Sequence, residues 1–236
     1  MDTSNLPENI VPLYNTLRQK YRAEFEPLRI KDINLDILSV ADLEPLLAGK
    51  DPFQDIQDFP FWARLWEAAI VLADLMVTMP AKPGQSLLEL GAGLGAPGLF
   101  AASRGYRVTA SDYEPHIMDF IKVSAAANQL SGITFQLLDW LKPPALPRYD
   151  TIIGAEILFR EEFFQPLLTI FKRFLAPDGT IFLAHDQRRK SLGSFLSLAE
   201  KEYEIGVIPR KIKIDEDEKT IIIARLRRRH DTPFLQ

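Results

Sequence analysis

The chain has 236 residues, of which 47% are hydrophobic and 25% charged, and its formal net charge is −4. This is an ordinary composition for one globular domain with an extension, and the acidic balance disfavours a nucleic-acid-binding protein. The absence of cysteine excludes disulfides, thiolate nucleophiles and cysteine metal sites. The N-terminus has no signal-like segment and the chain has no apolar run of transmembrane length, so we expect a cytoplasmic protein that does not bind membranes.

Residues 1–58 are predicted to form an N-terminal extension of helical and mixed structure, serving as a lid or a substrate-docking surface. The expected elements are a helix over 11–25, where apolar residues recur at helical spacing, an alternating strand over 33–40, a short helix over 41–47 and a loop over 51–60. The main domain is expected over 59–236.

The main domain is predicted to open with an amphipathic helix over 63–79, stopped by Pro80 and Pro83. Strands and helices then alternate: strands over 86–90, 107–111, 133–138, 150–155 and 180–185, and helices over 96–104, 115–129, 161–175 and 191–201. This alternation predicts a parallel sheet covered on both faces. Two final strands, 203–208 and 220–226, follow without a helix between them and should form a hairpin whose last strand is antiparallel. The fold class is therefore α/β, a Rossmann-like, doubly wound, seven-stranded sheet.

A glycine-rich turn follows the first of these strands, in the run Glu89-Leu-Gly-Ala-Gly-Leu-Gly95, and Asp112 ends the next strand. Glycines let a ligand approach the helix N-terminus closely, and an acid on the second strand can bind ribose hydroxyls. The run also satisfies a relaxed dinucleotide fingerprint, Gly91-x-Gly93-x-x-Ala96. Glu89 favours S-adenosylmethionine over NAD, because a carboxylate can receive an ammonium group but repels a pyrophosphate. The alternative is a tight turn with no ligand.

Four acids, Glu89, Asp112, Asp139 and Glu156, stand at the ends of four successive predicted strands. In an open α/β sheet, ligands bind at the carboxyl ends of the strands. The four carboxylates are therefore expected to surround one site.

From about residue 59 to about 228 the sequence resembles the seven-strand, class I S-adenosylmethionine-dependent methyltransferases. It is most similar to the family-16 group, which contains many protein-lysine methyltransferases. The motifs that carry the resemblance occur in order: Trp62-Ala-Arg-Leu-Trp66, Glu89 to Gly95, Asp112, Asp139-Trp140 and Glu156-Ile-Leu-Phe159. The resemblance implies S-adenosylmethionine as cofactor, a protein substrate that presents a lysine, and no metal ion. We expect a monomer.

The resemblance also implies roles for the residues around the cofactor. Gly91, Gly93 and Gly95 would pass beside its methionine part, and Glu89 would orient its amino group. Asp112 would accept both ribose hydroxyls. Asp139, Trp140 and Tyr113 are predicted to contact the adenine. Trp66 is predicted to approach the cofactor from the segment before the glycine-rich turn. Each of these three aromatic residues has packing as its alternative role, and Trp62 is expected one helical turn before Trp66 on the same helix face.

Glu156 and Phe159 are the predicted catalytic residues. Related lysine methyltransferases usually have Asp-x-x-Tyr at these positions, so the acid is retained but the tyrosine hydroxyl is missing. Glu156 could hold a substrate ammonium, and it also belongs to the cofactor-binding set; Phe159 could line a lysine channel through cation–π contact. His185 is expected to be structural, and the basic runs at 188–190 and 225–229 are expected to be solvated. The departure from the family pattern leaves open a small-molecule N- or O-methyltransferase or a non-catalytic cofactor-binding module, with a nicotinamide oxidoreductase as a weaker alternative.

Overall fold

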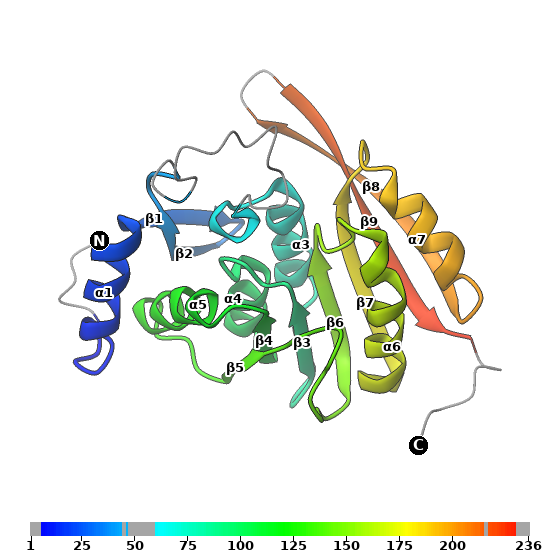
Figure 1. Cartoon of the computed structure of the whole chain (residues 1–236), viewed down its shortest axis with the longest axis horizontal. Helices are drawn as coiled ribbons and strands as arrows, with labels where there is room; N and C mark the ends of the chain where they lie inside the picture. The colour runs from blue at the N-terminus through cyan, green and yellow to red at the C-terminus, as the bar shows by residue number, and fades with distance from the viewer. Residues whose placement is uncertain (1–5, 44–45, 47–59, 215–216, 230–236) are drawn as a thin grey trace.

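The computed structural model describes residues 6–43, 46, 60–214 and 217–229, and a seven-stranded sheet forms its centre (Figure 1). The strand order is β5-β4-β3-β6-β7-β9-β8. The strands are β3 (Ser86–Leu90), β4 (Arg107–Asp112), β5 (Ile133–Leu137), β6 (Tyr149–Ala155), β7 (Leu175–Asp186), β8 (Tyr203–Ile214) and β9 (Asp217–Arg228). Strands β3 to β7 run parallel, and β9 lies antiparallel between β7 and β8. The predicted α/β class and the antiparallel last strand are confirmed.

Helices cover both faces of the sheet. One apolar core lies beneath α3 (Glu67–Thr78), α4 (Ala96–Ser103) and α5 (Pro115–Ala127), and a second core lies beneath α6 (Phe164–Phe174) and α7 (Ser191–Ala199). Successive residues of β3 point to opposite faces, because Leu87 belongs to the first core and Leu88 to the second. The order of strands reverses direction between β3 and β6, which is where an open α/β sheet places its ligand site.

The first helix, α1 (Val11–Tyr21), is shorter than predicted. Arg22 adopts a left-handed conformation (φ 49°) that ends the helix, and the strand β1 (Ala23–Ile30) follows, which the sequence did not predict. β1 pairs antiparallel with β2 (Ile33–Val40), the strand expected there. Residues 41–43, the start of the predicted short helix over 41–47, are not helical, and most of the predicted loop over 51–60 lies outside the described residues.

The N-terminal hairpin of β1 and β2 is hydrogen-bonded to α5 through backbone groups on the outer edge of β2. The Leu38 N–H donates to Ser124 Oγ (2.9 Å), and the Asp36 N–H donates to Asn128 Oδ1 (2.8 Å). The Asn128 side chain returns a hydrogen bond to the Asp36 carbonyl (2.7 Å). Side-chain groups of α5 thus satisfy the edge of β2, so the hairpin packs against the main domain.

The predicted start of α3 at residue 63 is wrong. A short 3₁₀ turn, η3 (Phe61–Ala63), is followed by extended backbone, and α3 begins only at Glu67, after Trp66 (φ −82°, ψ 148°). The indole N–H of Trp66 donates to the Phe61 carbonyl (2.8 Å), which holds the two segments at an angle. Trp62 and Trp66 therefore do not share a helix face.

Trp62 instead joins a buried aromatic cluster. Its ring centroid lies 5.8 Å from that of Tyr21, 4.7 Å from that of His116 and 5.2 Å from that of Phe120. Trp62 thereby links α1 to the start of α5.

The basic run at 225–229 lies mostly in β9 and is not a tail, but Arg225, Arg227 and Arg229 are exposed to solvent, as expected. Arg228 is buried, and its guanidinium donates to the carbonyls of Phe171, Lys172 and Leu175 at the end of α6.

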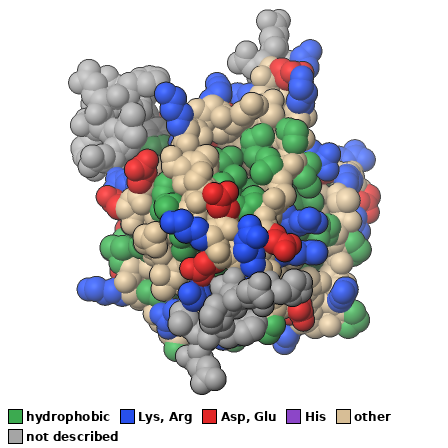
Figure 2. Space-filling view, turned by 90° about the vertical axis from the view of Figure 1, so that its right-hand side faces the viewer, with side chains coloured by type: hydrophobic (Ala, Val, Ile, Leu, Met, Phe, Trp, Pro, Cys, Tyr) green, Lys and Arg blue, Asp and Glu red, His purple; other side chains and the backbone are tan. Residues whose placement is uncertain are grey.

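On the face formed by α7 and the β8–β9 hairpin, acidic side chains are interspersed among basic ones (Figure 2). Among the described residues, no helix combines the length and the apolar character needed to cross a bilayer.

Candidate active site

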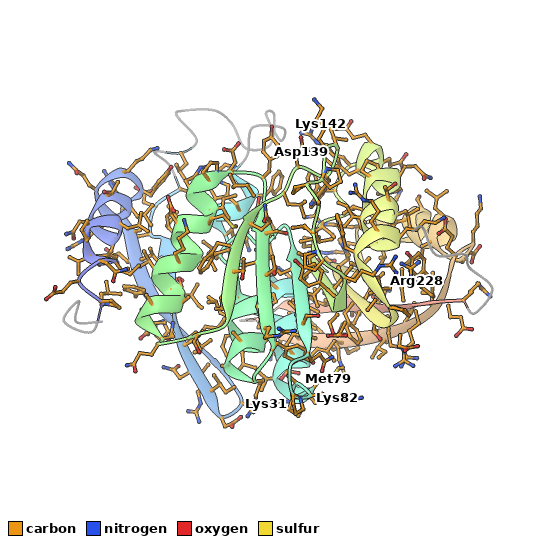
Figure 3. All side chains as sticks on the ribbon, turned by 90° about the horizontal axis from the view of Figure 1, so that it is seen from below. Lys31, Met79, Lys82, Asp139, Lys142 and Arg228 are labelled. Atoms are coloured by element: carbon orange, nitrogen blue, oxygen red, sulfur yellow. The ribbon has the colours of Figure 1, made fainter. Side chains whose placement is uncertain are left out.

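A cavity of about 620 Å³ opens at the carboxyl ends of the central strands. In Figure 3 Asp139 lies at this end of the sheet, and Lys82, shortly before β3, lies at the opposite end. Every predicted site residue lines the cavity: Trp66, Glu89, Gly91, Gly93, Gly95, Asp112, Tyr113, Asp139, Trp140, Glu156 and Phe159. The structure brings these residues together, and their individual roles remain predictions.

The glycine-rich loop between β3 and α4 forms the floor of the cavity. Gly95 has φ 75°, and a Cβ added there would lie 2.9 Å from the Ile121 side chain. Gly93 has φ 53°, and its N–H donates to Asp112 Oδ2 (2.9 Å). Left-handed backbone of this kind favours glycine, and it leaves the loop open to a ligand.

Asp112 ends β4 with both carboxylate oxygens held by backbone donors. Oδ2 accepts the Gly93 N–H and Oδ1 accepts the Tyr113 N–H (2.7 Å). Burial raises the pKa of this carboxyl, and the two N–H groups oppose that rise. Because each oxygen of a carboxylate accepts more than one hydrogen bond, Asp112 retains capacity for a pair of ligand hydroxyls.

Glu89 is buried beneath the start of α4, with 2% of its surface exposed. Burial raises its pKa to about 8, the Gly98 N–H lowers it, and the charge of Asp112 raises it further. Glycine at position 98 makes room for the carboxylate, since a Cβ there would overlap Oε2. Oε2 has no well-formed hydrogen bond among the described residues. A buried carboxylate with so few hydrogen-bond partners fits a ligand with an ammonium group and does not fit a pyrophosphate.

The next strand end provides the wall predicted to contact adenine. Asp139 follows β5, and its Oδ1 accepts the Leu141 N–H (2.8 Å), which fixes the turn. The Trp140 ring packs edge-on against Phe163 (5.4 Å between centroids), and so it serves both in packing and as cavity wall. Tyr113 lines the cavity and is 66% exposed, and its predicted role of covering the adenine stays a prediction.

Aromatic side chains surround the opening of the cavity, and we call Phe61, Trp66, Phe159 and Phe163 the aromatic mouth. The Phe61 ring stacks on Phe159 (6.5 Å) and lies 5.9 Å from Trp66, and Phe159 meets Phe163 edge-on at 5.6 Å. Phe159 is 47% exposed, so the mouth is open to solvent. Phe61 and Phe163 were not predicted, since neither stands in a recognisable motif.

Glu156 connects the mouth to the interior of the cavity. Its backbone is left-handed (φ 56°), and its Oε1 accepts the Asp186 N–H (2.7 Å). Oε2 lies 2.6 Å from Arg189 Nε and 3.6 Å from Nδ1 of the fully buried His185. Sequence reasoning missed Arg189, although it belongs to the basic run directly after β7. That run was expected to be solvated, and this expectation is wrong for Arg189.

Comparisons with known proteins bear on this site. The family described as "Lysine methyltransferase" matches residues 54–202. "EEF1A lysine methyltransferase 3" of Mus musculus is 34% identical over 131 residues, which cover 53% of this chain and 56% of that protein. "Histone-arginine methyltransferase METTL23" of Rattus norvegicus is 35% identical over 111 residues, which cover 44% of this chain and 49% of that protein. The similarity thus spans about half the length of these two relatives.

Solved structures show the same fold. The N-methyltransferase NodS of Bradyrhizobium japonicum, in complex with S-adenosyl-L-homocysteine, superposes with a TM-score of 0.55 at 19% identity, covering 79% of this chain and 96% of that one. At this identity the likeness concerns the fold alone.

Proposed function

The chain belongs to the lysine methyltransferase family, whose members have the class I fold and use S-adenosylmethionine, and from this premise we propose that it methylates a lysine side chain in a protein. When bound, this cofactor supplies a methyl group activated by a sulfonium, which is a good leaving group. The work left to the protein is to bind, align and desolvate the reactants.

The cofactor end of the cavity suits this group. Glu89 offers a buried carboxyl oxygen to the amino group, and Asp112 offers two fixed oxygens to the ribose. Asp139 and Trp140 form the wall assigned to adenine. These acceptor groups and the indole ring suit an ammonium, a diol and a flat base, in that order along the carboxyl edge of the sheet.

The aromatic mouth is the proposed path of the acceptor. A lysine amine has a reference pKa of about 10.4 and must lose a proton before it attacks. Aromatic walls remove water from the amine, and this favours its neutral form. Phe159 and Phe61 can contact the aliphatic stem and the charged head by packing and cation–π interaction.

One observation carries the proposal: a single cavity joins the four strand-end acids to a solvent-open aromatic mouth. An open mouth suits a side chain presented by another protein better than a small molecule, which is usually enclosed. The division of the chain at residue 58, with the N-terminal segment as lid or docking surface, stays a prediction.

Arginine is a second candidate acceptor. Glu156 already holds a guanidinium, that of Arg189, within the cavity. A guanidinium therefore fits this position.

The test is methyl transfer from tritiated S-adenosylmethionine into a lysate of the source organism, followed by hydrolysis and separation of methylated amino acids. We expect label in methyl-lysine of a discrete protein band, and none with the Asp112→Ala variant. Label in methyl-arginine would show that the acceptor is arginine and not lysine. Label confined to small molecules would overturn the proposal of a protein substrate, and cofactor binding without any transfer would favour a binding module.

A further inference from the structure

Arg189 enters the cavity from the loop between β7 and α7. Its Nε lies 2.6 Å from Glu156 Oε2, and its guanidinium carbon lies 5.9 Å from the centre of the Trp66 ring. The side chain of Arg189 is 35% exposed, whereas that of Glu156 is 10% exposed. A partly exposed cation thus covers a nearly buried carboxylate beside an aromatic ring.

These contacts define a cation seat, formed by Glu156 and Trp66. Each member has a further contact besides Arg189. The Asp186 N–H holds Glu156 Oε1, and the Phe61 carbonyl holds the Trp66 indole. The seat offers the carboxylate and the aromatic ring that bind ammonium and guanidinium groups. The guanidinium carbon of Arg64 also lies over the Trp66 ring, at 4.8 Å, so the carboxylate of Glu156 is the part of the seat that Arg189 alone among the described arginines occupies.

We propose that Arg189 is an internal placeholder in the cation seat, and that the cationic head of the acceptor side chain displaces it; this inference rests on the proposed function. Exchange of one cation for another keeps Glu156 paired while the acceptor binds, before the amine loses its proton. An uncharged acceptor that expelled Arg189 would leave a nearly buried carboxylate unpaired, which is unfavourable. Arg189 therefore selects cationic acceptors over neutral hydroxyl compounds of similar size.

The adjacent Arg188 provides a matched control. It forms a two-pronged ion pair with Asp186, Nε–Oδ1 3.0 Å and Nη2–Oδ2 2.6 Å. Its side chain is 74% exposed, and it does not line the cavity. Replacement of Arg188 or of Arg189 by alanine removes the same charge from the same loop.

The experiment titrates the cofactor-free protein with n-butylammonium and with ethylguanidinium, as mimics of lysine and arginine heads. Binding is followed by NMR through the indole N–H signal of Trp66, assigned with a Trp66→Phe variant. We expect Arg189→Ala to bind one or both probes roughly fivefold more tightly than the wild type, since partly exposed ion pairs compete only modestly. Arg188→Ala should behave as the wild type, and Arg189→Ala combined with Glu156→Gln should lose the gain.

Unchanged or weaker probe binding by Arg189→Ala would overturn the placeholder, because Arg189 would then be a positioning residue for Glu156. An equal gain in Arg188→Ala would also overturn it, as a general charge effect. The titration contains no methyl donor and no protein substrate. A fivefold gain together with failed protein methylation would therefore overturn the proposed function alone, and normal methylation without the gain would overturn the placeholder alone.

Discussion

The side chains at the two ends of the cavity are held in place by different kinds of contact. At the cofactor end, carboxylates are held by backbone donors: Asp112 by the N–H groups of Gly93 and Tyr113, and Asp139 by that of Leu141. At the mouth, the Phe61–Phe159 stack and the Glu156–Arg189 pair are contacts between side chains, and backbone groups of Asp186 and Phe61 add one hydrogen bond each, to Glu156 and Trp66.

Because of this difference, the geometry of the cofactor end is determined by the backbone fold, whereas the geometry of the mouth can be changed by a few side-chain substitutions. Backbone donors remain when neighbouring side chains are replaced, so the cofactor end depends on the course of the strands and loops. The mouth changes with each side chain in it. Acceptor specificity is therefore expected to reside at the mouth, and cofactor affinity at the strand ends.

The largest effect expected is on cofactor affinity in Asp112→Ala. The variant loses the proposed acceptor of two ribose hydroxyls and leaves the Gly93 N–H without its partner. A loss of about 2–3 kcal/mol, roughly 30- to 150-fold in Kd, is expected. Calorimetry with S-adenosylhomocysteine measures it, with the exposed Asp178→Ala as control. Binding of n-butylammonium at the mouth should not change, and a parallel loss there would contradict the separation of the two ends.

The second prediction concerns pH and Glu89, whose pKa burial raises to about 8. Because this pKa is higher in the folded than in the unfolded chain, the contribution of Glu89 to stability is present at low pH and is lost as pH rises from about 4.5 through about 8. Unfolding in urea at several pH values should show this decline, and Glu89→Gln should reduce it.

At pH 7 Glu89 is mostly protonated without a ligand, and pairing with an ammonium requires its ionised form. Binding of S-adenosylhomocysteine should then release a proton, which calorimetry in buffers of different ionisation enthalpy detects. The Glu89→Gln variant should release none. Equal proton release in both proteins would exclude Glu89 as the ammonium partner.

A smaller effect is expected from glycine at the cofactor end. Gly95→Ala adds a Cβ at φ 75° and 2.9 Å from Ile121, and should destabilise the fold by about 1–3 kcal/mol. Gly193→Ala, in α7, meets nothing within 4 Å and should stabilise by about 0.5–1 kcal/mol. Urea unfolding of both variants compares them, and equal shifts would show that the loop tolerates a side chain.

The smallest effect is expected at the mouth. Phe159→Ala removes one aromatic wall, which should raise KM for the protein substrate by about fivefold, equivalent to about 1 kcal/mol of cation–π contact. Cofactor Kd should stay the same. Phe159→Tyr retains the wall and should behave nearly as the wild type. A matching change in cofactor affinity for Phe159→Ala would show that the two ends of the cavity do not act independently.

The strand ends were predictable from sequence because two simple rules act together. Apolar runs located the strands, and the topology of open α/β sheets placed Glu89, Asp112, Asp139 and Glu156 at one edge. Of the mouth, Trp66 and Phe159 were predicted from their motifs. Phe61, Phe163 and the neighbouring Arg189 were not, because their contacts depend on loop conformations that no periodic pattern encodes.

Two errors in the elements have similar causes. Trp62 and Trp66 have helical spacing, yet the indole of Trp66 binds the Phe61 carbonyl and the backbone between them is not helical. β1 was overlooked because Glu24, Glu26 and Pro27 are unfavourable in strands. Pairing with β2 overrides those preferences.

The attachment of β2 to α5 has a consequence for the newly made chain. Leu38 and its partner Ser124 are 86 residues apart, and Asp36 and Asn128 are 92 apart. At about 5–20 residues per second, translation delivers these partners roughly 4–18 s after β2 has been made. During that interval the outer edge of β2 presents unpaired backbone groups of the kind that promote aggregation. Helix α5 ends this exposure, and the same helix begins directly after Asp112 and Tyr113, so the hairpin becomes protected at the stage of synthesis when the cofactor site gains its second strand.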